Sequence, residues 1–205
     1  RLEKVYDGNV FATTDPHITL VHTGKDVGTY DAYSDQFGYD LIGSTYRITP
    51  KELNLALTGG ARFDKTYDGN ANVTQSLTKG TNYNLNGFVT GEGTDIELSA
   101  VTGKYADKNA AADKAVTFDG LTLTGTGAGN YTLAATTAQG AGAITPRALT
   151  LGAVAAQSKT YDGTTAADAS KFSAALNNAV AGDNVTAAAA GATYNDHNVA
   201  AARTI

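Results

Sequence analysis

The stretch "KTYDGN" at residues 65–70 returns as "KTYDGT" at 159–164, and a close variant, "KVYDGN", stands at 4–9. A catalytic motif is needed once per active site, whereas a string that recurs at module spacing more often serves the architecture. Asp-Gly favours a tight turn, because glycine accepts positive φ and aspartate hydrogen-bonds to its own backbone there. The preceding tyrosine can bury its ring and send its hydroxyl to a backbone partner. The lysine shares the strand face of the tyrosine, so its stem can cover that ring.

The motif therefore predicts a hairpin corner with a ring beneath it, built three times along the chain. The residues of this structural motif are Lys4, Tyr6, Asp7, Gly8, Lys65, Tyr67, Asp68, Gly69, Lys159, Tyr161, Asp162 and Gly163.

Other strings recur in the same order. "ITPKELNL" (48–55) aligns without a gap with "ITPRALTL" (144–151), and "KYADKNAAADKAV" (104–116) corresponds to "TYNDHNVAAARTI" (193–205). Between them, "GEGTDIELS" (91–99) corresponds to the Gly- and Asp-containing stretch at 180–188. Ordered self-similarity of this length is the signature of tandem modules.

The modules are expected to join at the two Ile-Thr-Pro strings. Residues 1–49 form a short or partial module, 50–146 a complete one, and 147–205 a partial one that stops before any counterpart of "GLTLTGTGAGNYTLA". Proline favours an extended conformation in the residue before it, so neighbouring modules should be held in line. The third module is expected to expose an open sheet edge and to fray or pair with another molecule.

The hydrophobic period inside a module is two. In "KELNLALT" the leucines alternate, and in "AVTFDGLTLTG" Val116 and Phe118 alternate with small or polar residues. Such alternation, broken by Gly, Asp and Asn, is typical of half-buried antiparallel strands. We expect an all-β fold of tandem β-grasp-like or sandwich-like modules in an elongated array. One short helix per module is allowed, best placed within residues 166–181.

Composition excludes several function classes. The chain has no cysteine, so a disulfide framework, a zinc–thiolate site and a cysteine nucleophile are impossible. A formal charge of −5 argues against nucleic-acid binding and against docking to anionic membranes. No apolar run reaches the length of a membrane helix, so we expect no membrane insertion in this segment.

Taken together, "KTYDGN", "YADKNA", "GLTLTGTGAGNYTLA" and "AITPRALTL" closely resemble the YDG and MBG-type repeats of large bacterial surface proteins. Many of those proteins are filamentous-haemagglutinin-like adhesins exported by two-partner or autotransporter routes. The resemblance covers residues 50–146 fully and 147–205 in part. Residues 1–49 keep "KVYDGN" and "ITP" but depart elsewhere, which suggests a shorter MBG-type module. The family assigns no catalytic residues.

Calcium binding is one interpretation of the recurring acidic and amide side chains. Calcium prefers hard oxygen ligands, and oxygen-bearing side chains recur in both modules, although without the alternating Asp-x-Asp-x-Asp-Gly loop. The calcium candidates are Asp68, Asp107, Asn109, Asp162, Asp196 and Asn198. Capping of turns by Asp and Asn is the competing interpretation. No other cofactor is indicated, and neither a Gly-x-Ser-x-Gly elbow nor another catalytic constellation occurs, so we expect no enzyme activity.

The stretch "TYDAYSDQFGYD" (29–40) gathers aromatic residues among polar ones. Tyr30, Tyr33 and Tyr39 could stack on sugar rings, or could instead pack in the core and at sheet edges.

These observations predict spacer or stalk modules of an extracellular bacterial adhesin, which project a binding region from the cell surface. The expected partners are neighbouring repeats of the same protein. The alternative is direct adhesion in biofilm formation, by binding an exopolysaccharide or host glycan or by self-association.

Overall fold

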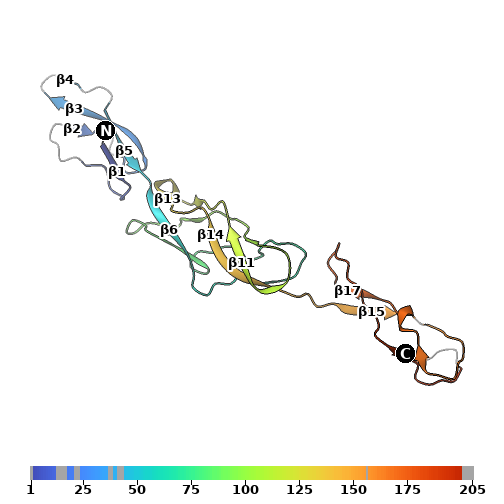
Figure 1. Cartoon of the computed structure of the whole chain (residues 1–205). Coiled ribbons are helices and arrows are strands. Elements are labelled where there is room, and N and C mark those ends of the chain that lie inside the picture. The colour runs from blue at the N-terminus through green and yellow to red at the C-terminus, as the bar shows by residue number, and fades with distance from the viewer. Residues whose placement is uncertain are drawn as a thin grey trace.

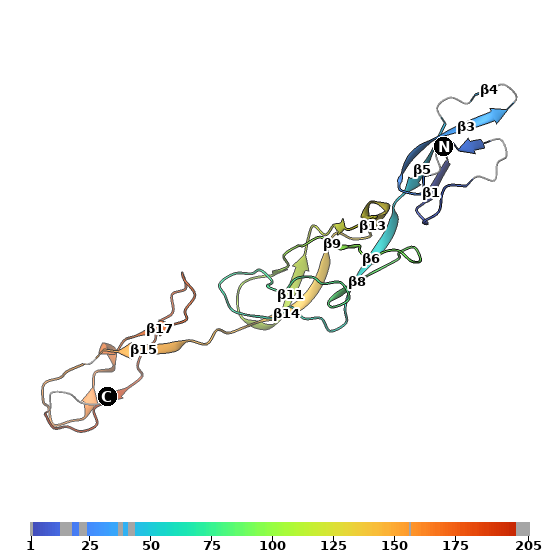
Figure 2. The ribbon, with the colours of Figure 1, turned by 180° about the vertical axis from the view of Figure 1, so that it is seen from behind.

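The computed structural model describes residues 2–12, 18–20, 24–36, 39–40, 44–155 and 157–199. These residues form strands and two single-turn 3-10 helices, η1 (Ala128–Asn130) and η2 (Ala169–Lys171), with no α-helix in the described ranges. The all-β prediction is confirmed, and the short helix expected within 166–181 is η2. Three segments follow one another along one axis (Figure 1), and the view from behind shows the same row (Figure 2).

The first segment is one small mixed sheet with the strand order β1-β5-β3-β2, and β4 pairs with β3 at its far end. Its strands are β1 (Leu2–Val5), β2 (Ile18–Leu20), β3 (Gly28–Gln36), β4 (Tyr39–Asp40) and β5 (Ser44–Thr49).

The middle module consists of three small sheets, with the orders β10-β11-β14-β7, β13-β6-β8 and β12-β9. Its strands are β6 (Lys51–Leu57), β7 (Lys65–Thr66), β8 (Tyr83–Asn86), β9 (Glu97–Leu98), β10 (Lys104–Tyr105), β11 (Ala111–Phe118), β12 (Leu123–Thr124), β13 (Tyr131–Leu133) and β14 (Ala138–Thr145).

The third segment holds two two-stranded sheets, β15-β17 and β16-β18. Its strands are β15 (Thr150–Val154), β16 (Ala166–Ala167), β17 (Ala174–Asn177) and β18 (Ala192–Thr193). Pro50 separates β5 from β6, and Pro146 lies between β14 and β15.

Burial follows the period of two that the sequence showed. In β11 the side chains of Lys114, Val116 and Phe118 are buried and those between them are not. In β8 Tyr83 and Leu85 are buried, whereas the asparagines that follow them are exposed. The apolar faces meet in a core of the middle module that contains Phe63, Tyr83, Phe118, Ile144 and their neighbours.

A second core lies across the join at Pro50. Tyr6, Tyr46 and Ile48 of the first segment pack there against Leu53, Ile96 and Tyr131 of the middle module. The first two segments therefore share buried apolar surface, and their relative position is fixed by packing as well as by the short connection.

One pairing places the Tyr-Asp-Gly motif in this architecture. The strand that carries the motif lies parallel to the Ile-Thr-Pro strand that leaves the module, with Lys4 opposite Ile48 in the first segment and Lys65 opposite Ile144 in the second. The tyrosine amide continues both ladders, since Tyr6 donates to the Thr49 carbonyl at 2.8 Å and Tyr67 to the Thr145 carbonyl at 2.9 Å. Parallel strands end at the same side of a sheet. The motif therefore lies at the exit end of its module.

Candidate functional site at the module junctions

Each Tyr-Asp-Gly corner is closed by the lysine that precedes it. Lys65 Nζ donates to Asp68 Oδ1 at 2.6 Å and to the Asn70 carbonyl at 2.9 Å. Lys4 and Lys159 repeat both bonds, to the aspartate three residues on and to the carbonyl five residues on. We call this arrangement the lysine clamp. The ammonium group lowers the pKa of Asp162 to about 2, mainly through its hydrogen bond.

The clamp differs in two ways from the predicted hairpin with a ring beneath it. The corner follows a strand that pairs in parallel, so it is a bend at a strand end and not a hairpin turn. The lysine lies over a different tyrosine, with Lys65 Nζ 5.6 Å from the centre of the Tyr105 ring and Lys159 Nζ 5.7 Å from that of Tyr194. The hydroxyls of these two tyrosines, and not those of the motif, donate to backbone carbonyls within the same module.

The calcium candidates have protein partners. The Asp68, Asp107 and Asp162 carboxylates each accept a hydrogen bond from a lysine ammonium group, so a cation would have to displace it. Asn109 and Asn198 donate their backbone amides to Asp107 and Asp196, as capped turns do. The described residues contain no group of three or more acidic or histidine side chains placed to hold a metal.

The three motif tyrosines differ in their surroundings. Tyr6 is 1% exposed and lies in the shared core, Tyr67 is half-buried, and Tyr161 is 61% exposed. Tyr67 packs against the core of its own module, whereas Tyr6 belongs to the core that the first two segments share.

A valine of the following module contacts the motif glycine at both junctions. A Cβ on Gly8 would lie 2.9 Å from Val89 Cγ1, and a Cβ on Gly69 would lie 2.6 Å from Val180 Cγ1. At Gly163 nothing lies within 4 Å. Glycine is needed at these corners for its positive φ, and at two of them also because the valine methyl group takes the place of a side chain.

The two valines belong to equivalent loops. Glu92 donates its amide to the Val89 carbonyl at 3.0 Å, and Asp183 donates to the Val180 carbonyl at 3.1 Å. Each loop follows the strand that pairs antiparallel with the entry strand, β8 with β6 and β17 with β15. It is therefore held at the entry end of its module, against the preceding corner. We call residues 88–92 and 179–183 the entry loops.

Each entry loop also carries a carboxylate that faces a lysine of the preceding module. Lys25 Nζ lies 3.9 Å from Glu92, and Lys108 Nζ lies 3.5 Å from Asp183. The lysines are about half exposed, so each pair contributes little to stability and mainly favours this orientation.

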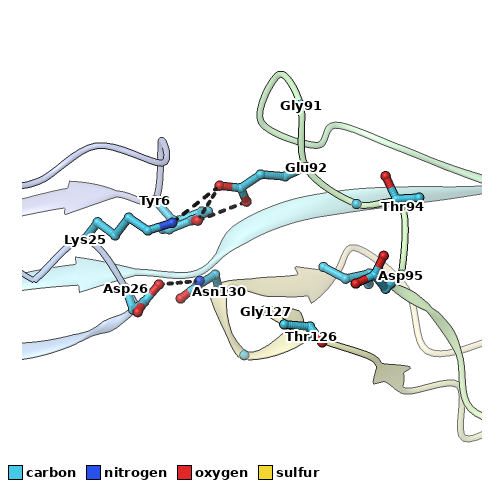
Figure 3. Close-up of a pocket in the computed structure, with 13 residues that line it drawn as sticks. Tyr6, Lys25, Asp26, Gly91, Glu92, Thr94, Asp95, Thr126, Gly127 and Asn130 are labelled. Atoms are coloured by element: carbon cyan, nitrogen blue, oxygen red, sulfur yellow. Dashed lines mark hydrogen bonds and ion pairs between the residues drawn. The ribbon is translucent and has the colours of Figure 1, made fainter.

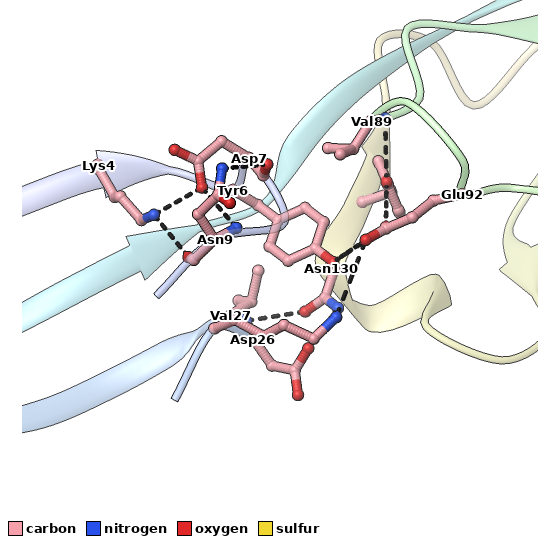
Figure 4. A network of polar contacts seen from close by, with 11 residues as sticks. Lys4, Tyr6, Asp7, Asn9, Asp26, Val27, Val89, Glu92 and Asn130 are labelled. Atoms are coloured by element: carbon pink, nitrogen blue, oxygen red, sulfur yellow. Dashed lines mark hydrogen bonds and ion pairs between the residues drawn. The ribbon is translucent and has the colours of Figure 1, made fainter. Parts of the chain in front are cut away.

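The first junction adds a polar network (Figure 4). The Tyr131 and Tyr6 hydroxyls donate to the Glu92 carboxylate at 2.6 and 2.8 Å, and these bonds lower the pKa of Glu92. Burial, followed by the bond to Glu92, raises the pKa of Tyr131 to about 12 and shifts that of Tyr6 upward as well. Buried Asn130 accepts from the Val27 amide and donates to Asp26, both at 2.8 Å.

Aromatic rings fill the space beside this network. The Tyr6 and Tyr131 rings meet edge to face at 5.4 Å, and Phe88 meets Tyr131 in the same way at 5.2 Å. Pairs of this geometry add roughly 0.5–1.5 kcal/mol beyond the area they bury.

An open polar cavity of about 560 Å³ borders the same junction (Figure 3). Figure 3 shows Asp26, Glu92 and Asp95 on its walls, with Glu92 turned toward Tyr6 and Lys25. Glu92 and Asp26 are engaged in the junction contacts above.

The second junction also borders a cavity. A cavity of about 290 Å³ opens between the two modules and is lined by Tyr67, Asn109, Ala110, Pro146, Arg147, Leu149, Ala179, Val180, Asp183 and Val185.

The three glycan candidates lie in β3 and β4. The Tyr30 ring is half-buried and stacks on Tyr46 at 5.0 Å, and its hydroxyl donates to the Asp26 carbonyl at 2.7 Å. Both contacts lie within the first segment. The side chains of Tyr33 and Tyr39 lie outside the described part of the structure. Glycan contact by these residues stays a prediction.

Sequence reasoning missed the entry loops and their partners, chiefly Val89, Glu92, Asn130 and Tyr131. A signal was present, because "VTGE" at 89–92 and "VAGD" at 180–183 share valine, glycine and an acid at the same spacing. Its meaning depended on knowing that this loop meets the corner of a different module.

Comparison with protein families identifies the architecture. The YDG domain model matches residues 49–138 and again 145–205, which together make up more than half of the chain. The chain therefore belongs to the YDG domain family. Comparisons with curated proteins and with solved structures found no match.

Removing the clamp lysine should destabilise the middle module most. Lys65→Ala leaves Asp68 without its ammonium partner at a site where the lysine side chain is 3% exposed, and we expect a loss of about 2–3 kcal/mol. Lys159→Ala, where the lysine is 25% exposed, should cost less. Urea unfolding of the two variants measures the difference, and equal losses would contradict a buried clamp.

The glycine–valine contact has a matched control within the chain. Gly8 and Gly163 have φ of +78° and +74°, so alanine at either position carries a similar backbone penalty of roughly 1–2 kcal/mol. Only Gly8→Ala also collides with Val89. Thermal unfolding should show a larger loss for Gly8→Ala than for Gly163→Ala, whereas equal losses would mean that the valine contact is unimportant.

Acid should weaken the first junction through Glu92. Its pKa is lower in the folded chain than in the unfolded one, so its stabilisation is present above the ordinary pKa of about 4.3 and is lost as the pH falls through the folded value. At pH 7 Glu92→Gln should cost about 1–2 kcal/mol, because it removes a charged acceptor. The difference in the free energy of unfolding between wild type and variant, measured by denaturant titration, should become smaller toward pH 3. A difference in unfolding free energy that does not change with pH would refute the ionic role of Glu92.

Proposed function

We propose that this chain consists of spacer modules of an extracellular bacterial adhesin, which hold a binding region away from the cell surface. The supporting observation is that two successive joins use the same contact, a valine of the entry loop on the glycine of the preceding corner. A repeated contact of this kind fixes the angle between successive modules, as a spacer requires. Stability in such arrays is the sum of each unit and its neighbour interfaces.

Other observations fit this proposal. The YDG family match covers the two modules whose sequence resembles the repeats of bacterial surface proteins. None of the helices in the described residues has the length and apolar character needed to cross a membrane. The proposal includes no catalytic role and no cofactor.

Small-angle X-ray scattering of the whole chain tests the spacer function. A chain with fixed joins should give a scattering profile that the extended row of Figure 1 reproduces. Val89→Asp combined with Val180→Asp places a charge against each glycine corner and should broaden the distribution of interatomic distances. Circular dichroism should show that the strands persist in this variant.

The matched control is Val199→Asp, because this valine is 81% exposed and neither lines a junction cavity nor touches a corner glycine. Wild-type scattering that already matches freely jointed modules would contradict the proposal. A glycan array run on the same protein tests the alternative function, direct adhesion, which saturable binding would indicate.

A further inference from the structure

The dipeptide Asp-Gly occurs four times in the chain, three times in the Tyr-Asp-Gly corners and once as Asp119-Gly120. Asp-Gly readily forms a cyclic imide, because glycine has no side chain to keep its nitrogen from the aspartate carboxyl carbon, Cγ. The glycine nitrogen bonds to Cγ, and its proton leaves with the carboxyl hydroxyl group as water. Water then opens the imide at Cγ, which restores aspartate, or at the backbone carbonyl carbon, which gives isoaspartate.

At the three corners two hydrogen bonds hold the aspartate carboxylate. The clamp lysine donates to one of its oxygens at 2.6–2.7 Å. The backbone amide two residues on donates to the same oxygen, at 2.9 Å from Asn9, 3.2 Å from Asn70 and 2.9 Å from Thr164. Both bonds favour the ionised carboxylate, which has no hydroxyl group to lose. They also oppose the side-chain rotation that brings Cγ to the glycine nitrogen.

Asp119 has neither of these two bonds. The residue three positions before it is Val116, which is buried and carries no charge. The amide two residues on, that of Leu121, donates instead to the Thr136 carbonyl at 2.9 Å. In the described part of the chain no group donates to the exposed Asp119 carboxylate. The space beside Gly120 is also open, with nothing within 4 Å of a Cβ placed there.

The place of Asp119 in the fold makes isoaspartate disruptive there. Asp119 and Gly120 connect Phe118, the last residue of β11, to Leu121. The side chains of Phe118 and Leu121 belong to the core of the middle module and are 0% and 1% exposed. Isoaspartate adds one carbon atom to the main chain between them. A close-packed core does not absorb such a shift without losing contacts.

We infer that Asp119 is the Asp-Gly site at which the folded chain isomerises to isoaspartate, and that the lysine clamps protect the three Tyr-Asp-Gly corners from the same reaction. Water is the only reagent, and each passage through the imide exchanges one carboxyl oxygen. The clamp therefore has a chemical role besides closing the bend, because it preserves the glycine corner on which the next module packs. This chemistry is independent of the spacer function.

Incubation of the whole chain in oxygen-18 water near pH 7 tests the inference. Each passage through the imide adds one heavy oxygen, which mass spectrometry of proteolytic peptides locates, and isoaspartyl methyltransferase labelling counts the isoaspartate. We expect both signals at Asp119 to exceed those at each corner aspartate at least tenfold. Asn86-Gly87 can form the same imide with loss of ammonia, and peptide mapping keeps that site separate.

Substitution of a clamp lysine tests the protection. Lys159→Met, at a site where the lysine is 25% exposed, should raise the heavy-oxygen label at Asp162 several-fold and leave the label at Asp119 unchanged. Lys171→Met is the matched control, because this lysine is 61% exposed and faces Asp168, which no glycine follows. It should change the label at none of the Asp-Gly sites.

A second clamp variant and an Asp119 variant complete the test. Lys4→Met repeats the measurement at Asp7 in the first segment, so the result does not rest on the folding of one variant. Asp119→Glu should abolish the slow loss of thermal stability that incubation causes in the wild type, because glutamate would have to form a less favourable six-membered imide.

Three results would overturn the inference. The first is equal label at all four Asp-Gly sites of the folded chain, and the second is unchanged label at the freed aspartate in both clamp variants. In concentrated urea the four sites should take up label at similar rates, because the folded contacts are gone. The third contrary result is a difference that persists in urea, which would assign it to the neighbouring residues in the sequence and not to the clamp.

Discussion

The parallel pairing of the motif strand with the departing Ile-Thr-Pro strand is the constraint on which the array depends. Because both strands run in the same direction, the Tyr-Asp-Gly corner must lie where the chain leaves the module. The entry loop is delivered to the same place by a second pairing, that of β8 with the start of β6. Two strand pairings, one in each module, therefore bring the Tyr-Asp-Gly corner and the entry loop together. The junction needs no separate linker.

The residues of the motif contact both their own module and the next one. Its lysine and aspartate act inward, closing the bend and covering a tyrosine of their own core. Its glycine contacts a valine of the next module at both junctions, and Tyr6 also joins the core that the first two segments share. These separate roles explain why four residues of different chemistry recur together. The lysine and aspartate close the bend, and the bend in turn presents the glycine to the next module.

The sequence predicted the strands well and the contacts between modules poorly. Val116 and Phe118 alternate with less buried neighbours, and that period is a local property of the chain. The partner of the Tyr6 hydroxyl is Glu92, 86 residues away, and no local pattern indicates that pairing. The position of the lysine was predicted wrongly for a related reason. Lys65 and Tyr67 would share a strand face by spacing, but β7 ends at Thr66 and the Lys65 ammonium group lies over Tyr105.

The row of modules also has a mechanical consequence. β6 enters the middle module and β14 leaves it, and Figure 1 shows both strands running along the length of the array. Tension on the two ends of the chain would pull β14 lengthwise past β11 and β7, its hydrogen-bonded neighbours. Those hydrogen bonds lie across the direction of pull, so they are loaded together in shear and do not open one at a time. A pulling force on the chain would therefore meet the resistance of whole ladders.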